Sequence, residues 1–343
     1  MLDSRSPALR RPVLELTSAG LYCPAGGFHV DPWGQVDRAV VTHGHSDHAR
    51  PGHAAYEGSA LGEGIVRRRL GTDIAYQGHP YGEAFRIGDA LVSFHPAGHV
   101  LGSAQVRIEV DGEVWVVSGD YKREPDPSCT PFELVPCDGF VTEATFALPI
   151  YRWDAGARVI DEVLAWWDEN VRQGRTSIVF CYALGKAQRL LAEIGARLDR
   201  PVFLHGALLS MVDAYRDAGV ELASTMAVSD QPKADRFRGE FVLAPPSAMA
   251  STWMRRFTNP STAFVSGWMR VRGQRRRRGY DRGFVLSDHV DWPDVVRTVE
   301  ETGARQVLAT HGYADSLARF LREERGLDAR PIETLYEGER DDG

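Results

Sequence analysis

The sequence lacks three features that would each point to a particular class of protein. It has only four cysteines, Cys23, Cys129, Cys137 and Cys181, and no two of them are spaced as Cys-x-x-Cys. This spacing excludes a zinc ribbon and a thioredoxin-like redox motif, so we expect free thiols that are mostly buried. No stretch approaches the roughly 18 consecutive apolar residues of a membrane span, and residues 1–7 contain no apolar signal core. We therefore expect a cytoplasmic protein without a membrane partner.

An excess of positive charge is missing as well. The formal net charge is −7, from 40 lysines and arginines against 47 aspartates and glutamates. A protein that coats nucleic acid by bulk charge would have the opposite sign, so a nucleic-acid contact would need a local basic groove. The length of 343 residues allows one large domain or two ordinary ones, and the apolar content of 43% is typical of a globular protein.

The sequence does contain a high density of histidine and aspartate in one short segment. Residues 43–48 read His-Gly-His-Ser-Asp-His and follow an apolar, largely β-branched run. Three imidazoles and a carboxylate are costly to bury in a core because each needs a polar partner, but they suit a metal site in the loop after a strand. We expect His43 and His45 to face one metal ion, and Asp47 and His48 to face a second.

Four further positions repeat the pattern of a polar side chain placed just after a buried strand. They are His99 in a glycine-flanked turn, Asp120 after the apolar run at residues 114–117, and His289 and His311 after later apolar runs. A single histidine after a strand is more often a structural residue than a ligand. Five such placements in one chain, the hexapeptide included, indicate one shared site.

The apolar pattern divides the chain into a β-rich part and a part in which helices and strands alternate. Up to about residue 155 the apolar runs are short, and an Asp-Gly step at residues 111–112 predicts a hairpin. Beyond it, helical periodicity at residues 159–167 and 187–194 brackets a predicted strand at residues 177–182, as in a small parallel α/β unit. The other predicted strands are residues 39–42, 90–94, 104–110, 114–118, 283–287 and 306–310, with a helix at residues 294–299.

The histidines and aspartates follow the order of a known fold. The series His43-x-His45-x-Asp47-His48, His99 and Asp120 resembles the metallo-β-lactamase fold, and Glu143, His289 and His311 resemble motifs A, B and C of its β-CASP nuclease branch. The resemblance covers nearly the whole chain, and segment 182–188 is similar to one in the β-CASP insertion. More narrowly, segments 22–32 and 42–50 resemble the bacterial ligase-associated DNA exonucleases.

This resemblance implies an α/β protein with two domains. An αββα metallo-β-lactamase sandwich would comprise residues 1–150 and 282–343, and an inserted β-CASP-like α/β domain would comprise residues 151–281. The implied activity is that of a metal-dependent phosphodiesterase, a DNA exonuclease in DNA repair. The implied partners are single-stranded or end-containing DNA, with RNA as an alternative, together with a DNA ligase and a helicase.

The resemblance also implies a role for each site residue. One divalent ion would be held by His43, His45 and His99, the other by Asp47, His48 and His311, with Asp120 bridging them. Imidazole and carboxylate ligands suit Zn²⁺ or Mn²⁺, and two such ions can activate water near neutral pH and neutralise the charge that grows on a phosphodiester. The implied catalytic residues are Asp47, Asp120, His289 and Glu143. In this scheme His289 protonates the leaving oxygen, and Glu143 orients its ring.

Motif B departs from the wider branch at one position. It reads Ser287-Asp288-His289, where much of the branch has a small residue before the histidine. A carboxylate close to His289 would raise the pKa of its imidazole.

A run of arginines could supply the local basic groove. The candidates for nucleic-acid contact are Arg270, Arg272, Arg275, Arg276, Arg277 and Arg278. Trp268 and Tyr280 flank the run and could stack on bases. Arg255 and Arg256, which follow Trp253, form a weaker second patch.

The sequence leaves three other functions open. A small-molecule metallohydrolase such as a thioesterase or lactonase would share the fold, but the long separation between Asp120 and His289 leaves room for a domain that grips a polymer. An RNA-processing nuclease of the same branch would use the same metal ligands. A binding subunit with a degenerate site is disfavoured because every ligand position is filled.

Overall fold

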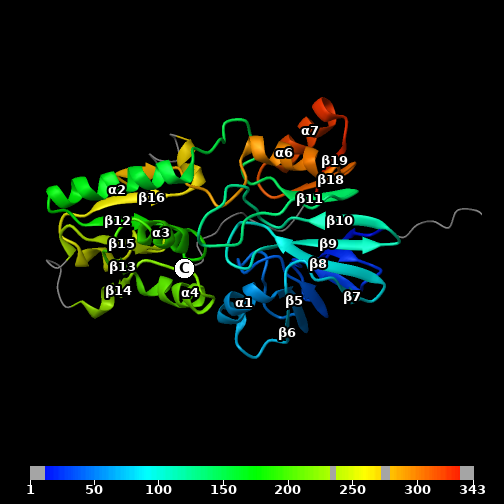
Figure 1. Cartoon of the computed structure of the whole chain (residues 1–343), viewed down its shortest axis with the longest axis horizontal. Helices are drawn as coiled ribbons and strands as arrows, with labels where there is room; N and C mark the ends of the chain where they lie inside the picture. The colour runs from blue at the N-terminus through cyan, green and yellow to red at the C-terminus, as the bar shows by residue number, and fades with distance from the viewer. Residues whose placement is uncertain (1–11, 232–236, 272–278, 333–343) are drawn as a thin grey trace, which may run out of the picture.

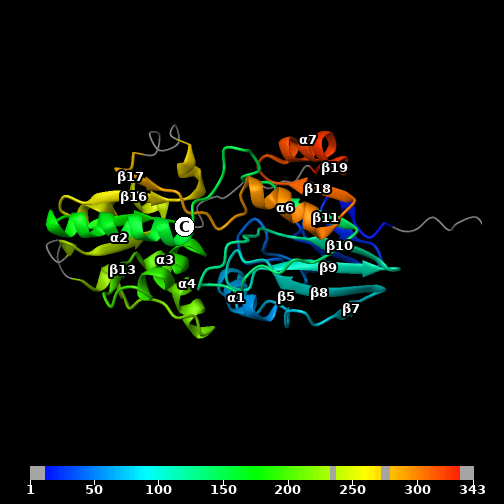
Figure 2. The ribbon, with the colours of Figure 1, turned by 45° about the horizontal axis from the view of Figure 1, so that its top comes forward.

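Three β-sheets make up the core of the computed structural model, which describes residues 12–231, 237–271 and 279–332. Two of the sheets lie at one end of the long axis of the molecule, and the third lies at the other end (Figures 1 and 2). We refer to the first two sheets with α1, α6 and α7 as the sandwich, and to the third sheet with α2, α3 and α4 as the third-sheet unit.

The first sheet has six strands in the order β1-β2-β3-β4-β5-β6. Its first three strands are antiparallel, whereas β3 to β6 run parallel. The strands are β1 (Glu15–Thr17), β2 (Gly20–Cys23), β3 (Phe28–Val30), β4 (Arg38–Val40), β5 (Ala55–Ser59) and β6 (Tyr76–His79), and α1 (Glu63–Leu70) precedes β6.

The second sheet has seven strands in the order β19-β18-β11-β10-β9-β8-β7. Strands β7 to β10 are antiparallel, and β10, β11, β18 and β19 are parallel. The strands are β7 (Phe85–Ile87), β8 (Ala90–Pro96), β9 (Ala104–Val110), β10 (Glu113–Val117), β11 (Gly139–Glu143), β18 (Gln306–Thr310) and β19 (Asp328–Pro331). The predicted hairpin joins β9 to β10, and Asp111 and Gly112 have φ of 51° and 78°, the positive values that a type I′ turn requires.

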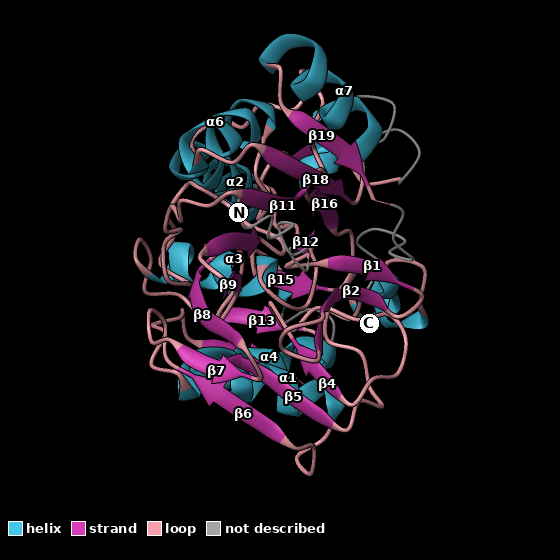
Figure 3. Ribbon diagram, turned by 90° about the vertical axis from the view of Figure 1, so that its right-hand side faces the viewer, coloured by secondary structure: helices cyan, strands magenta, loops and turns pink. Residues whose placement is uncertain are grey.

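The two sheets pack face to face and are covered by helices on their outer faces. Phe28 and Val40 of the first sheet and Phe94 and Val106 of the second belong to one buried apolar cluster. On the outer side of the second sheet lie α6 (Trp292–Thr302) and α7 (Ala314–Arg325), visible beyond β18 and β19 in Figure 3. Leu70 of α1 packs against the first sheet. This arrangement confirms the αββα sandwich expected from the sequence.

The third sheet is fully parallel, with the strand order β14-β13-β15-β12-β16-β17. Its strands are β12 (Ser177–Phe180), β13 (Val202–Leu204), β14 (Thr225–Ala227), β15 (Phe241–Ala244), β16 (Ser261–Val265) and β17 (Arg282–Phe284). One face is covered by α2 (Gly156–Arg172), α3 (Lys186–Gly195) and α4 (Gly206–Asp217). The other face meets short 3₁₀ helices, including η4 (Pro246–Ala248), η5 (Thr252–Arg256) and η6 (Gly267–Arg270). The division at residues 151–281 stays a proposal, since β17 lies just beyond it and pairs with β16.

The strand predicted at residues 283–287 is shorter than expected. It ends at Phe284, because the chain then leaves the third sheet and crosses towards the sandwich. There the carbonyl of Ser287 accepts a hydrogen bond from the Arg189 side chain rather than from a neighbouring strand. Within the described part of the chain, no helix has the length and apolar character needed to cross a membrane.

Candidate metal centre

The candidate metal ligands lie on loops of the sandwich that follow strands. The hexapeptide comes after β4 and forms one turn, in which the backbone N–H groups of His48 and Ala49 donate to the carbonyl of His45. The other candidates come from the second sheet: His99 after β8, Asp120 after β10, Glu143 at the end of β11 and His311 after β18. Sequence position at strand ends thus brings residues from distant parts of the chain to one place.

The first ligand set consists of His43, His45, His99 and Asp120, whose ligand atoms lie within 4.8 Å of one another. Nδ1 of His45 is 3.0 Å from Nε2 of His43 and 3.0 Å from Nε2 of His99. Three imidazole nitrogens that converge beside a carboxylate form a donor set that suits Zn²⁺.

The second ligand set consists of Asp47, His48 and His311, again within 4.8 Å of one another. Nε2 of His48 lies 3.8 Å from Oδ2 of Asp47, and the rings of His48 and His311 are stacked with centroids 5.2 Å apart. His311 has a positive φ of 62°, which turns the chain directly after β18. The metal-ligand roles of both sets are proposals that this convergence supports.

Asp120 lies between the two sets. Its Oδ2 is 3.5 Å from Nε2 of His43 and 3.4 Å from Nε2 of His48. Its Oδ1 is buried and accepts no hydrogen bond from any residue that the structure describes. A buried carboxylate oxygen without a donor carries a desolvation cost that a bound cation would remove. The residues present therefore fit a pair of divalent cations with Asp120 between them.

Asp31 is a functional candidate to which the sequence analysis gave no role. Its Oδ2 accepts hydrogen bonds from Nδ1 of His48 at 2.7 Å and from the Thr42 hydroxyl at 2.6 Å, and its Oδ1 accepts from the Thr42 N–H at 2.8 Å. A carboxylate on Nδ1 fixes the imidazole so that Nε2 is presented to the metal site. The signal was available, because Asp31 also follows directly after a buried strand, β3.

Burial and neighbouring charges shift the pKa values of the histidines in different directions. Burial and the nearby imidazoles lower the pKa of His43 and of His99 well below the usual value, and burial lowers that of His311 to about 4. Burial opposes protonation of His48 too, but the carboxylates of Asp120, Asp47 and Asp31 raise its pKa well above the usual value. Three of the histidines are therefore neutral at pH 7, which is the form that binds a metal ion.

The candidate general acid, His289, is bonded to its predicted partner. Its Nδ1 lies 2.9 Å from Oε2 of Glu143, and the other carboxylate oxygen of Glu143 accepts the backbone N–H of Tyr121 at 2.8 Å. Both side chains are buried, and their polar atoms lie within 4.8 Å of the Asp120 carboxylate. The indole N–H of Trp153 donates to the carbonyl of His289 at 2.9 Å. Glu143 therefore holds the imidazole through Nδ1, and Nε2 is the atom that can give a proton.

Asp288, the unusual residue of motif B, directs its carboxylate towards the third-sheet unit. Oδ2 lies 2.8 Å from Nζ of Lys186, and Oδ1 lies 3.4 Å from a guanidinium nitrogen of Arg189. These cations compensate the carboxylate charge of Asp288, which the sequence suggested could raise the pKa of His289. The carbonyl of Asp288 accepts a hydrogen bond from Nδ1 of His99 at 2.7 Å.

The predicted nucleic-acid contacts are only partly described. Arg272, Arg275, Arg276, Arg277 and Arg278 lie outside the described residues, whereas Arg270 is exposed at the end of η6. The two aromatic candidates are engaged within the protein. Trp268 packs against Phe146 with ring centroids 4.7 Å apart, and Tyr280 stacks on Phe264 at 5.2 Å with an angle of 8°. Both rings thus pack against aromatic side chains of the protein, and their role in base stacking stays a prediction.

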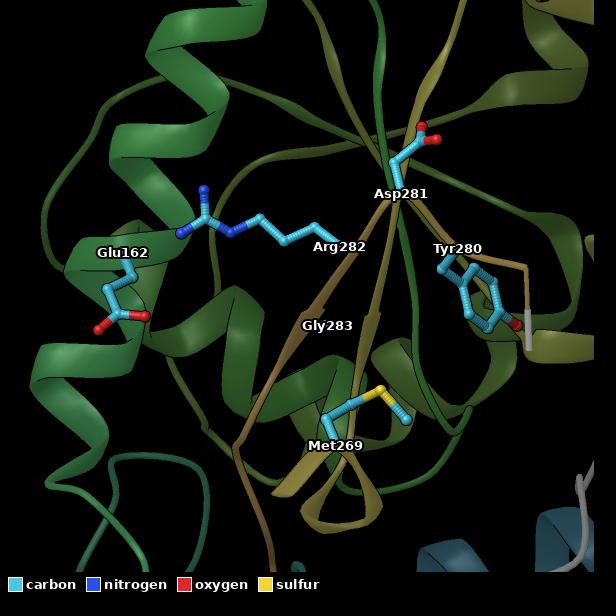
Figure 4. Close-up of a pocket in the computed structure, with 6 residues that line it drawn as sticks. All are labelled: Glu162, Met269, Tyr280, Asp281, Arg282 and Gly283. Atoms are coloured by element: carbon cyan, nitrogen blue, oxygen red, sulfur yellow. The ribbon is translucent and has the colours of Figure 1, made fainter. Parts of the chain in front are cut away.

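A surface cavity of about 280 Å³ lies in the third-sheet unit. Figure 4 shows Arg282 extending towards α2, from which Glu162 projects, while Asp281 and Tyr280 lie away from that helix. The remaining lining residues are Met269 and Gly283. Among the described residues that line it, two carboxylates accompany one guanidinium, and none is a metal-ligand candidate.

Comparisons with known proteins connect this site to a family, although no protein-family model matches the chain. The chain is 33% identical over 323 residues to a protein of Opitutus terrae described as a probable DNA ligase, a match that covers 92% of this chain and 30% of the relative. It is 27% identical over 130 residues to an RNase J-like protein of Methanocaldococcus jannaschii, covering 36% of this chain and 31% of the relative. The matched segments thus span about a third of either curated relative.

A solved structure supports the fold. The crystal structure of a protein of unknown function from Enterococcus faecalis V583 superposes with a TM-score of 0.57 and 12% identity, over 87% of this chain and 79% of that one. The sandwich with its third parallel sheet, the order of the clustered histidines and aspartates, and these sequence relatives agree with one another. The chain belongs to the β-CASP nuclease branch of the metallo-β-lactamase fold.

Proposed function

We propose that this protein is a metal-dependent DNA exonuclease that acts in DNA repair in the cytoplasm, with two Zn²⁺ or Mn²⁺ ions as cofactors. The observation that carries the proposal is the position of Asp120. It lies between two sets of ligand atoms and within 4.8 Å of the His289–Glu143 pair. Hydrolysis of a phosphodiester requires an activated water and a proton for the leaving oxygen, and these groups stand where both can be supplied.

The residues of the chain divide the work of hydrolysis. The two cations, when bound, would lower the pKa of the attacking water and neutralise the phosphate oxygens. His289 protonates the leaving oxygen of the scissile bond from Nε2, while Glu143 keeps the ring in position through Nδ1. Glu143 also stabilises the charged form of the imidazole, since it lies 2.9 Å away and both groups are buried.

The choice of DNA rests on the relative from Opitutus terrae. It is described as a probable DNA ligase, and the match extends over 92% of this chain while it occupies only 30% of the relative. A protein that combines this segment with a DNA ligase supports a partnership in which the nuclease prepares ends and a ligase seals them. A helicase that opens the duplex would supply the single strand.

Cleavage of RNA is the second candidate, favoured by the relative described as RNase J-like. The metal ligands do not separate the two substrates, because both contain the same phosphodiester. A small-molecule thioesterase or lactonase is less favoured, since the third-sheet unit adds six parallel strands beside the site and a small substrate needs no such extension.

A substrate panel tests the proposal. The full chain, loaded with Mn²⁺ or Zn²⁺, is incubated with single-stranded DNA, with RNA of the same sequence and with a chromogenic thioester. We expect hydrolysis of DNA that exceeds that of RNA, and no turnover of the thioester. Asp120→Ala should lose metal and DNA hydrolysis together, which elemental analysis and the same assay measure, whereas Asp73→Ala, at an exposed carboxylate, should lose neither. Preferred hydrolysis of RNA or of the thioester would overturn the proposal.

A further inference from the structure

Two histidines of the first ligand set are held by groups that belong to, or are tied to, the third-sheet unit. Nε2 of His45 lies 3.3 Å from the carbonyl of Leu184, in the segment between β12 and α3. Nδ1 of His99 donates to the carbonyl of Asp288 at 2.7 Å, in the segment that returns from β17. Hydrogen bonds to the second nitrogen of a ligating imidazole set its orientation and its basicity.

In the second ligand set, His48 is held by a group of the sandwich. Asp31, after β3, accepts from Nδ1 of His48 at 2.7 Å. Thr42, which bonds to the same carboxylate, also lies 3.1 Å from Nδ1 of His43. The support of His48 therefore does not depend on where the third-sheet unit sits, and Thr42 gives His43 of the first set a support from the sandwich as well.

The first turn of α3 fixes the peptide that supports His99. Lys186 Nζ lies 2.8 Å from the Asp288 carboxylate, and Arg189 donates to the carbonyl of Ser287 at 2.7 Å. Both cationic side chains are 1% exposed. Lys186 thus contacts the side chain of Asp288, and Arg189 contacts the main chain of Ser287. The next residue in the chain is His289. One anchored dipeptide thus connects a metal-ligand candidate to the candidate acid.

Lys186 and Arg189 belong to an electrically balanced group of ions that is buried except for Glu124, whose side chain is 39% exposed. Arg189 lies 3.6 Å from the carboxylate of Asp126 and 3.0 Å from that of Glu124, and Asp126 also pairs with Lys122. Together with Lys186 and Asp288, three cations face three carboxylates. Such a cluster is stable only with all partners in place, because one unpaired buried charge is costly. The third-sheet unit therefore docks at this point in one arrangement.

We propose that Lys186 and Arg189 are positioning residues, through which docking of the first turn of α3 assembles the first metal site. The second site forms without them. This inference rests on the proposed metal centre and adds that affinity for one of its two ions is controlled from the third-sheet unit.

The test measures the affinity of each metal site. Full-length protein is stripped with a chelator and titrated with Zn²⁺ against a chromogenic competitor. Wild type should take up two ions. The charge-balanced variant K186M/D288N should bind one ion as before and the other about 10–100-fold more weakly, the usual cost of losing an outer-shell partner. A wild type that binds no metal tightly would sink the proposed metal centre, a result distinct from failure of this inference.

Two comparisons assign the loss to one site. D31N should weaken the second site more than the first, since Asp31 contacts His48 directly and reaches His43 only through Thr42. The triple variant D31N/K186M/D288N should weaken both sites strongly. R68M/D217N is the matched control. It removes another ion pair between the sandwich and the third-sheet unit, between α1 and α4, that touches no ligand, and both affinities should stay at the wild-type level.

The inference is overturned if K186M/D288N binds two ions like wild type, or if R68M/D217N weakens the first site to the same extent. If circular dichroism shows that K186M/D288N does not fold, Arg189→Lys decides, since it keeps the charge but shortens the reach to the Ser287 carbonyl. A lower Zn²⁺ affinity of the first site in that variant supports the positioning role of Lys186 and Arg189. Wild-type affinity at both sites contradicts it.

Discussion

At the residue scale, the proposed proton donor and the proposed metal ligands are different side chains, so their effects should be separable. His289 is held by Glu143 and stands beside Asp120 without belonging to either ligand set. His289→Ala should therefore keep full metal content and lose about 10²–10⁴-fold in the rate of DNA hydrolysis, the usual contribution of a general acid. Elemental analysis and initial rates measure the two quantities.

A substrate with a different leaving group provides a control for His289→Ala. A nitrophenyl phosphodiester releases a phenolate that needs no proton, so the loss caused by His289→Ala should shrink on that substrate. An equal loss on both substrates would show that His289 supports the site in some other way.

His311 predicts how the metal-free protein responds to acid. Burial lowers its pKa to about 4 from the ordinary value of 6.5, so the unfolded chain binds a proton between these values and the folded protein does not. The free energy of unfolding should therefore fall as the pH drops from about 6.5 to about 4 and be unaffected by His311 above that window. His311→Gln lacks this proton-binding difference. Its melting temperature should fall less than that of wild type between about pH 7.5 and about pH 4.5, and equal falls would contradict the assignment.

At the element scale, tight turns after the strands bring the ligand loops together. Gly119, between β10 and Asp120, has φ of 56°, and an added Cβ would meet Thr42 atoms at 2.6 Å. Gly119→Ala should therefore displace Thr42 and, through it, Asp31. Gly112→Ala is the matched control, because Gly112 has φ of 78° but open space around it. We expect Gly119→Ala to lower the free energy of unfolding by about 1–3 kcal/mol more than the control does in urea titrations. If both variants lose the same free energy of unfolding, the loss comes from backbone strain and the contact with Thr42 has no effect.

The sequence predicted the elements that have a local signal. The strands at residues 104–110 and 306–310 were predicted at their observed bounds, since their alternation and flanking turns are local properties. Strand β17 was predicted too long, because an apolar run does not show where the chain leaves a sheet. Ligand candidates were found because each is a polar residue after an apolar run.

The supporting residues were harder to predict, because their partners are far away in the chain. Lys186 and Arg189 are ordinary polar residues of an amphipathic helix in the sequence, yet their partner Asp288 lies about a hundred positions later. Asp31 similarly reaches across to the hexapeptide from the strand before it. Contacts between side chains so far apart in the sequence depend on how the sheets pack, and the periodicity of apolar residues does not predict them.

At the scale of the whole molecule, the proposed function requires a chain of net negative charge to hold an acidic polymer. The four arginines at residues 275–278 lie outside the described residues, and we propose that they contact the polymer backbone. Replacing all four by glutamine should weaken binding of single-stranded DNA and flatten its salt dependence, since each phosphate contact contributes a slope of about −0.7 in log K against log salt. Cleavage of a small phosphodiester should stay unchanged. If DNA binding keeps its salt dependence, the exposed Arg255 and Arg256 become the candidates.

The central claim is that the two ligand sets, with His289, form a DNA exonuclease. Its most direct test is the time course of digestion of one single-stranded DNA labelled separately at its 5′ and 3′ ends, with Mn²⁺ or Zn²⁺ and with Asp120→Ala in parallel. The account predicts that one label appears as a mononucleotide from the earliest times, that the other label marks a ladder of progressively shorter strands, and that Asp120→Ala yields neither. Internal fragments from both labels at the earliest times, or undiminished digestion by Asp120→Ala, would contradict it.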